Sequence, residues 1–169
     1  SDFMPILEDV GLRVIAANPY EVELLNESGT IYIFAVQDQE EHQFAVDGRD
    51  ELLSETILAS SSGDVVSDSL NALVLSTGLH WREVDVLRGY LGYAFQIGAV
   101  PSRLSIRGAL IQYPRIAREL FELFATKFDP DSSATKQERL TEVAQRRAAF
   151  FRSLRSVSAL ADDRALRRL

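Results

Sequence analysis

Four arginines are the side chains of this sequence best suited to bind a partner or a small ligand. They lie near the connection between two predicted helices, and they are Arg82, Arg88, Arg103 and Arg107. A guanidinium can hold a carboxylate through two parallel hydrogen bonds, so we interpret them as candidate contacts for a partner or an effector. Ion pairs among the chain's own helices are the more common role of such arginines. The two roles differ in whether the carboxylate belongs to this chain.

The remaining residue types predict no catalytic, cofactor-binding or metal site. The sequence has no cysteine, which excludes thiolate nucleophiles and thiolate zinc sites. Its only histidines are His42, expected in a solvated loop, and His80, expected to cap or pack at a helix start. Two glycines in residues 89–92 lack the spacing of a dinucleotide-binding turn. The only lysines, Lys127 and Lys136, fall in surface-like contexts that do not suit general acid–base work.

Charge is divided unevenly along the 169 residues. Residues 1–102 hold 4 Lys or Arg and 17 Asp or Glu, whereas residues 103–169 hold 14 and 8, so the net charge of −7 conceals a basic second part. A basic region can mark nucleic-acid binding, but these basic positions alternate with apolar ones at helical spacing. We therefore expect no nucleic acid and instead an acidic protein surface as the counterpart, such as the chain's own first part.

Nothing in the sequence predicts a membrane segment. No apolar run reaches the roughly 20 residues that span a bilayer, and the first residues carry no signal-peptide pattern. We expect no membrane contact and a cytoplasmic location. Hydrophobic residues make up 46% of the chain, enough for a packed core.

The first part of the chain mixes helix and strand signals. Apolar residues at helical spacing predict one kind of element, and polar–apolar alternation and β-branched runs predict the other. In chain order the predictions are a helix over 3–10 ending at Gly11, a short strand over 12–15 that stops before Asn18-Pro19, a strand over 20–24, a turn over 26–30, a strand over 31–36, a loop over 37–49 and a helix over 50–60 that Asp50 caps. The two strands around the turn predict an antiparallel hairpin, which needs a helix against one face to be stable.

From Ser67 onward the pattern is helical. The predicted helices cover residues 70–78, 81–98, 103–112 and 114–128, then a longest one opening at 131–133, and a last one capped by Asp162-Asp163. Thr135 and Glu138 have the spacing of a capping box. Leu58, Phe95 and Leu140 are among the residues expected to face inward. Phe150 and Phe151 are adjacent, so they cannot share one face of a helix, and one of them is expected at an interface.

Several stretches, in this order, resemble the large-type NAD-specific glutamate dehydrogenase of bacteria. They are residues 5–15, 19–22, 70–75, 78–84, 87–90, 120–130 and 162–169. The likeness covers most of the chain and is weakest over residues 26–68. No single stretch is chemically specific, and it is their shared order that carries the resemblance.

The resemblance implies an internal segment upstream of the catalytic domain, where small regulatory βαββαβ modules of the ACT type precede helical segments. Residues 1–65 are then expected to form an ACT-like regulatory module without its first strand, and residues 66–169 a helical segment truncated at its C-terminal helix. The implied fold class is α+β and mainly helical: an incomplete ACT-like module of a hairpin plus two helices, followed by an all-α segment.

The resemblance also implies a function for the parent protein, the oxidative deamination of L-glutamate to 2-oxoglutarate with NAD. The segment itself is expected to be catalytically inactive, to hold no cofactor, and to contact other domains of the parent chain in a homo-oligomer. Two alternatives stay open. The chain could be an amino-acid-binding regulatory module, or an independent helical adaptor that binds a partner through its basic second part.

Overall fold

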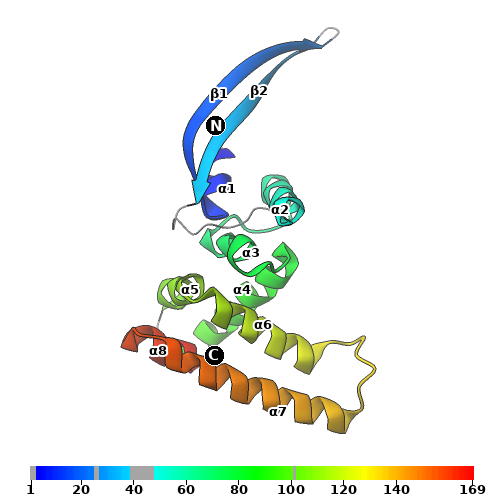
Figure 1. Cartoon of the computed structure of the whole chain (residues 1–169), viewed down its shortest axis with the longest axis vertical. Helices are drawn as coiled ribbons and strands as arrows, with labels where there is room; N and C mark the ends of the chain where they lie inside the picture. Colours follow the sequence, from blue (N-terminus) through cyan, green and yellow to red (C-terminus); the bar gives the residue numbers. More distant parts are fainter. Residues whose placement is uncertain (1–2, 25–26, 39–47, 101) are drawn as a thin grey trace.

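The computed structural model describes residues 3–24, 27–38, 48–100 and 102–169. The molecule is elongated (Figure 1): a two-stranded hairpin projects from one end, and the helices are stacked toward the other. The α+β, mainly helical class is confirmed. Within the described residues, no helix is both long and apolar enough to cross a membrane.

The chain begins with α1 (Phe3–Asp9), which ends as predicted at Gly11 with a φ of 89°. It then forms the antiparallel strands β1 (Leu12–Leu24) and β2 (Glu27–Asp38). The predicted interruption at Asn18-Pro19 is wrong, because β1 continues through it with Pro19 opposite Tyr32. Each strand of a two-stranded sheet has one unpaired edge, where a residue without an N–H is tolerated.

The hairpin is longer than the sequence suggested. The predicted turn over 26–30 is wrong, since Glu27–Thr30 already pair with Leu24–Glu21, and only residues 25–26, which lie outside the described residues, separate the strands. The register is irregular between Val14 and Ala16.

Most of the hairpin has no covering layer in the described structure. At its base Phe3 of α1 stacks on Phe34, with ring centroids 5.9 Å apart. Farther out, Tyr20, Ile31, Tyr32 and Ile33 are each more than half exposed. Side chains alternate between the faces of a strand, so Ile33 and Tyr32 lie on opposite faces, and both faces of the hairpin are apolar and open.

The predicted loop over 37–49 falls mostly on residues 39–47, which lie outside the described residues, and residues 37–38 belong to β2. The next helix, α2 (Asp50–Ser62), has Arg49 rather than Asp50 at its N-cap. Leu58 is 66% exposed and not inward as predicted, because the helix turns Thr56 and Ala59 to the interior. The buried Thr56 hydroxyl donates to the Leu52 carbonyl at 2.6 Å, which satisfies it without a distant partner.

The rest of the chain is helical, as predicted. The elements are η1 (Ser69–Asn71), α3 (Ala72–Thr77), α4 (Trp81–Gln96), α5 (Arg103–Gln112), α6 (Pro114–Phe128), α7 (Lys136–Ser153), η2 (Leu154–Ser156) and α8 (Leu160–Leu166). The single helix predicted over 70–78 is thus a 3-10 turn followed by a short α-helix. The Thr135–Glu138 capping box is confirmed, and it starts α7 at 136 and not at 131–133.

Two apolar clusters hold these elements together. The larger one joins η1 and α3 to α8 through side chains that are almost fully buried, including Leu73, Leu87, Leu110, Leu154 and Leu166. The smaller one places Leu75 of α3 under α1 and the start of β1, against Leu7, Val10 and Leu12. Helix α3 thus contributes to both clusters, with Leu73 and Val74 in the larger one and Leu75 in the smaller one, and so connects the hairpin end to the helical end.

The outer helices are less buried than their apolar patterns predicted. Phe95 is 40% exposed, with Ala94 buried in its place, and Leu140 on α7 is 55% exposed. Asp162 and Asp163 lie in the first turn of α8 and do not cap it. The last helix is nevertheless docked, since α8 packs on α5 and fully buries Leu166.

Candidate functional site

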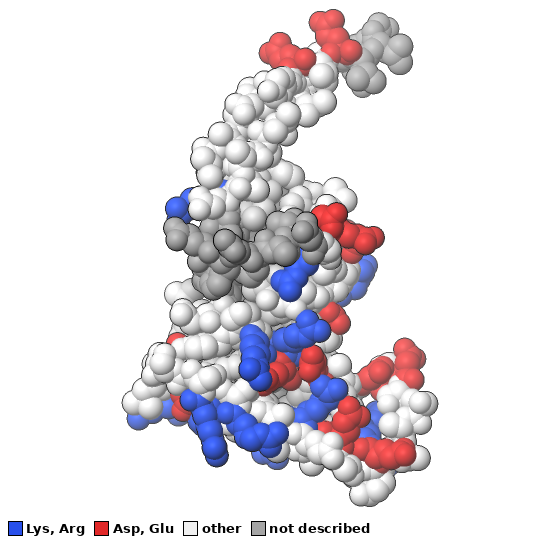
Figure 2. All heavy atoms as spheres, in the orientation of Figure 1, with Lys and Arg blue, Asp and Glu red and all other residues white. Residues whose placement is uncertain are grey.

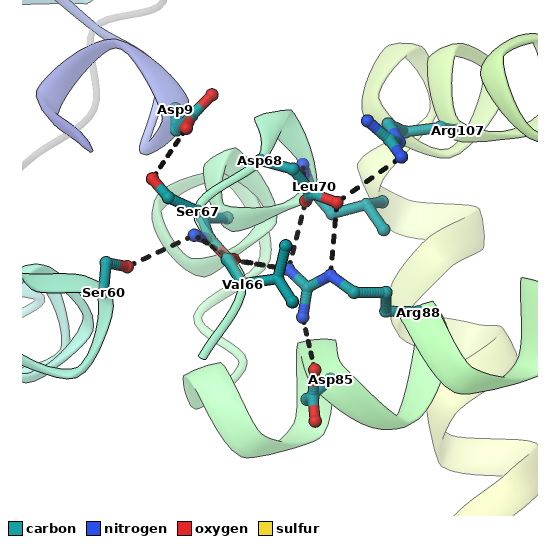
Figure 3. Close-up of polar contacts among 10 residues, drawn as sticks. Asp9, Ser60, Val66, Ser67, Asp68, Leu70, Asp85, Arg88 and Arg107 are labelled. Atoms are coloured by element: carbon teal, nitrogen blue, oxygen red, sulfur yellow. Dashed lines mark hydrogen bonds and ion pairs between the residues drawn. The ribbon is translucent and has the colours of Figure 1, made fainter. Parts of the chain in front are cut away.

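The four predicted arginines do not converge on one site. Arg88 on α4 and Arg107 on α5 both reach the carboxylate of Asp68. Arg82 and Arg103 instead lie on aromatic rings at the surface, 4.2 Å from the Trp81 centroid and 4.8 Å from the Phe95 centroid. Only Arg88 and Arg107 therefore meet at one site, the cluster around Asp68 that Figure 3 shows.

Asp68 occupies the cap position of η1 and also receives two arginines. Its Oδ1 accepts hydrogen bonds from the Leu70 backbone N–H at 3.0 Å and from Arg88 Nη2 at 3.1 Å. Its Oδ2 accepts from Arg88 Nε at 3.3 Å and lies 3.5 Å from Arg107 Nη2. Arg88 thus grips Asp68 with two nitrogens, in the bidentate manner expected for a carboxylate ligand.

The Arg88 guanidinium is fully engaged by its own chain. Besides Asp68, it donates to the Asn71 side-chain oxygen at 2.9 Å, to the Val66 carbonyl at 3.4 Å and to Asp85. The Asp68 and Arg88 side chains are only 13% and 15% exposed. An incoming carboxylate would have to displace Asp68 from this arginine, so the pair is built as a structural contact.

The same cluster also contacts the two helices nearest the hairpin, α1 and α2. Asn71, which is fully buried, donates to Ser60 Oγ of α2 at 3.4 Å and to the Val66 carbonyl at 3.2 Å. Ser67 Oγ donates to Asp9 of α1 at 2.7 Å. We call the residues Asp9, Ser60, Ser67, Asp68, Asn71, Arg88 and Arg107 the junction network; in Figure 3 they link α1 and α2 to α4 and α5.

A second group of polar contacts closes the end of α3. This helix ends at Gly78, whose φ is 73°. The Arg118 guanidinium on α6 donates to the Thr77 carbonyl at 2.6 Å, and the Arg49 guanidinium before α2 donates to the Leu75 carbonyl. Cations are favourable at helix C-termini, where carbonyls lack helical partners. Both arginines therefore tie neighbouring elements to α3.

The capping role expected for His80 is confirmed. Its Nδ1 accepts a hydrogen bond from the Arg82 backbone N–H at 3.1 Å. The backbone N–H of His80 donates to the Glu83 carboxylate at 2.8 Å. Its Nε2 lies 2.9 Å from a Glu55 carboxylate oxygen of α2. The histidine thus joins α4 to α2 and takes part in no group of metal ligands in the described structure. His42 lies outside the described residues.

The glycines and lysines considered in the sequence analysis all lie within helices. Gly89 and Gly92 lie inside α4, where backbone amides serve the helix, and not at the strand-to-helix turn that a dinucleotide pyrophosphate requires. These residues do not fit NAD. Lys127 lies over the Phe128 ring, 5.0 Å from its centroid, and Lys136 is the first residue of α7.

Among the described residues, Glu138 and Arg167 have displaced pKa values, and both belong to helix-terminal contacts. The Thr135 hydroxyl and backbone N–H, both bonded to the Glu138 carboxylate, lower the pKa of Glu138. The hydrogen bond to Asp163 raises the pKa of Arg167. Neither group lies in the junction network.

The sequence interpretation did not single out Asp68, although it is the centre of the junction network. A signal was present, since an Asp directly before a helical stretch is a typical N-cap. The two arginines that meet it could not be paired with it from spacing alone, because they come from helices 20 and more residues farther along.

Two family models match successive parts of the chain. Residues 1–49 match the family model "Glutamate dehydrogenase, ACT3 domain", and residues 65–130 match "Glutamate dehydrogenase, helical motif 3". Together these two matches cover more than half of the chain.

Proteins described as NAD-specific glutamate dehydrogenase match over 99% of this chain. The protein from Pseudomonas aeruginosa is 35% identical over 169 residues, that from Halomonas elongata 32% over 168, and that from Mycobacterium tuberculosis 28% over 173. In each case the chain spans about 10% of the relative's length. The two family models are also named for glutamate dehydrogenase. The ACT3 model covers the hairpin, and the helical-motif model covers several of the helices that follow it. The chain therefore belongs to the large NAD-specific glutamate dehydrogenases, as a segment that carries the ACT3 domain and helical motif 3.

Proposed function

We propose that this chain is a non-catalytic regulatory and scaffolding segment of a cytoplasmic NAD-dependent glutamate dehydrogenase, whose whole chain oxidatively deaminates L-glutamate to 2-oxoglutarate. The observation that carries the proposal is the junction network. Its partly buried charges, which could otherwise bind a ligand, hold η1 against α4 and α5. Hydrogen bonds from Ser67 to Asp9 and from Asn71 to Ser60 then join this part of the chain to α1 and α2. Such a network suits a segment that passes movements between neighbouring domains and does not suit one that carries out a reaction.

We further propose a division into an ACT-like module, residues 1–65, and a helical segment, residues 66–169. The contacts Ser67–Asp9 and Asn71–Ser60 cross this boundary. The small apolar cluster around Leu75 crosses it as well. Because polar and apolar contacts both span the boundary, the module and the helices should move as one body when the parent enzyme changes conformation.

The partners in this proposal are other domains of the parent chain and further copies in a homo-oligomer. The hairpin supports this, since a two-stranded sheet with apolar residues on both open faces is only marginally stable in water. A strand from elsewhere in the parent enzyme would take the place of the module's missing first strand. Arg82 and Arg103, both exposed, are the arginines left for partner or effector contacts, and Arg88 and Arg107 position the elements.

The test uses the full-length parent enzyme with Asp68→Ala, and Asp85→Ala as the control that removes only an exposed partner of Arg88. Both variants should keep the KM values for NAD and glutamate, because neither residue touches substrate. Asp68→Ala alone should alter the effector response or weaken subunit association in sedimentation. If Asp68→Ala instead raises the KM for NAD about tenfold with assembly intact, the segment contacts cofactor and the proposal is wrong.

A further inference from the structure

A groove runs along the helical end of the molecule, away from the junction network. It has a volume of about 540 Å³ and lies between α4, α6, α7 and the residues after α8. Its floor is apolar and is formed by Leu87, Leu120, Leu123, Phe124, Val143 and Phe150. Tyr93, Phe128 and Phe151 edge it and are 60%, 54% and 36% exposed. An open apolar surface of this kind marks an interaction site.

The rim of this groove is basic. Lys127, Arg147, Arg167 and Arg168 line it, and no Asp or Glu does. Arg167 is paired with Asp163 at 2.8 Å. Lys127, Arg147 and Arg168 have no ion pair within the part of the chain that the structure describes. We call the site the basic-rimmed groove; its charge suits a partner that brings both carboxylates and apolar side chains.

Helix α7, one wall of the groove, is poorly buried. It has 18 residues, and Phe150 is its only buried side chain. It packs mainly against α6, while Val143 and Phe151 face the groove. Helices in proteins are stabilised chiefly by burying an apolar face, and three helical walls leave room for a fourth helix in the manner of a bundle.

The lining favours a protein segment over a small molecule. Small-ligand sites hold a few convergent polar groups that orient the ligand. The hydroxyl of Tyr90, the groove's inner polar group, is already bonded to the Leu169 carbonyl at 3.1 Å. The cations without an ion pair lie at the rim, two of them over aromatic rings (Lys127 on Phe128 and Arg147 on Phe151), where side chains of a docked helix would reach them.

The hairpin does not reach this groove. The hairpin projects from the opposite end of the molecule (Figure 1), and Figure 2 shows acidic side chains at its tip and a mixture of basic and acidic ones over the helices at the other end. The chain spans about 10% of the length of its relatives, so a parent enzyme of that length tethers much further polypeptide to it. Tethering gives such polypeptide a high effective concentration at the groove.

We infer that the basic-rimmed groove is the docking site of an acidic amphipathic helix from another domain of the same parent polypeptide. Its apolar side chains cover Phe124 and Phe150, and its carboxylates pair with Lys127, Arg147 and Arg168. This inference rests on the proposed scaffolding function and specifies one of its contacts.

Lys127 provides a direct test, because it is the only lysine of the groove. In the full-length enzyme, a zero-length carbodiimide reagent joins an amine to a carboxylate that is paired with it. We expect mass spectrometry to find Lys127 linked to an Asp or Glu outside this segment. The Lys127→Arg variant keeps the charge and should lose the link. Mixed assemblies of isotopically labelled and unlabelled subunits should show the link within one polypeptide.

Hydrogen exchange of the full-length enzyme gives a second readout with a matched control. Arg147→Glu should speed amide exchange in α7 about tenfold by releasing the docked helix. Arg152→Glu reverses a charge on the same helix outside the groove and should leave the exchange unchanged. A link between two subunits, no link at all, or equal exchange in both variants would each overturn the inference. The KM measurements on Asp68→Ala are independent of these results, so the scaffolding proposal can survive a failure here.

Discussion

Asp68 shows how one carboxylate can organise several elements. It caps η1 and pairs with arginines from α4 and α5. Removing one partner of a pair with little exposure leaves the other charge poorly solvated, and this costs more than the pair itself contributes. Exposed ion pairs behave differently, because water solvates both partners after the pair is broken.

This contrast predicts the effect of two substitutions that act on the same arginine. Asp68→Ala should lower the free energy of unfolding by about 2–3 kcal/mol. Asp85→Ala, at a side chain that is 52% exposed, should lower it by about 0.5 kcal/mol or less. Urea unfolding followed by circular dichroism measures both. Equal losses in the two variants would mean that the junction network has no special role in stability.

Glu138 carries a prediction about pH. Its carboxylate accepts hydrogen bonds from Thr135, which hold its pKa below the ordinary value of 4.5. A carboxyl group with a lowered pKa in the folded state stabilises that state above its unfolded pKa, and the contribution is lost as the pH falls through the folded pKa. The first turn of α7 should therefore fray in acid below pH 4.5.

The variant Thr135→Ala tests this origin of the shift. Without the threonine hydroxyl, the pKa of Glu138 should move back toward its ordinary value, as read from NMR titration of the side-chain carboxyl carbon. An unchanged titration midpoint in the variant would rule out the capping box as the cause.

The short helix α3 depends on how it ends. It has six residues, too few for stability on its own. Its last carbonyls are satisfied by Arg49 and Arg118 from two other elements, and Gly78 turns the chain with a positive φ. The helix is thus stabilised by hydrogen bonds that neighbouring elements donate to its last carbonyls.

Two glycine-to-alanine substitutions should therefore have opposite effects. Gly78→Ala places a side chain in the left-handed region and should cost about 1–2 kcal/mol of stability. Gly89→Ala, inside α4 with open space around the new methyl group, should raise stability by about 1 kcal/mol because alanine favours helix. Thermal unfolding of both variants provides the comparison. Destabilisation by Gly89→Ala would show that this position needs close packing.

The helices were largely predictable from sequence because their ends carry local signals. Thr135 with Glu138, Pro114 and Gly98 each act within one turn of the helix they bound. The hairpin length was not predictable, since Ser28 and Gly29 are typical turn residues that strand pairing overrides. Local propensity yields to tertiary and cross-strand context in such segments.

The candidate site was only half predictable for a related reason. Arg88 and Arg107 were noticed as arginines able to hold a carboxylate, but the carboxylate turned out to be Asp68 of the same chain. Which charges meet depends on how helices pack, and sequence spacing does not encode that directly. The adjacent phenylalanines were easier, because helix geometry alone separates them: Phe150 is buried and Phe151 is 36% exposed.

The whole molecule has apolar surface at both ends. The hairpin exposes both of its faces, and the basic-rimmed groove exposes aromatic edges at the helical end. The smaller apolar cluster and the junction network lie between them. This arrangement suits a connecting piece that is held at each end by other parts of a larger enzyme.

Ile33→Thr tests the hairpin half of this account. Ile33 is 55% exposed, so the purified chain should lose no more than about 0.5 kcal/mol of stability. In the full-length enzyme the same substitution should weaken assembly, because the proposal has another part of the enzyme cover this side chain, and sedimentation should reveal smaller species. Intact assembly of the Ile33→Thr enzyme would indicate that this face of the hairpin stays open.

The central claim is that this segment contributes contacts between domains and no catalysis. Calorimetric titration of the purified chain with NAD and with glutamate, together with an assay for NADH formation, tests it most directly. We predict no saturable heat with either compound and no NADH. Saturable NAD binding that produces NADH in the presence of glutamate would contradict the account.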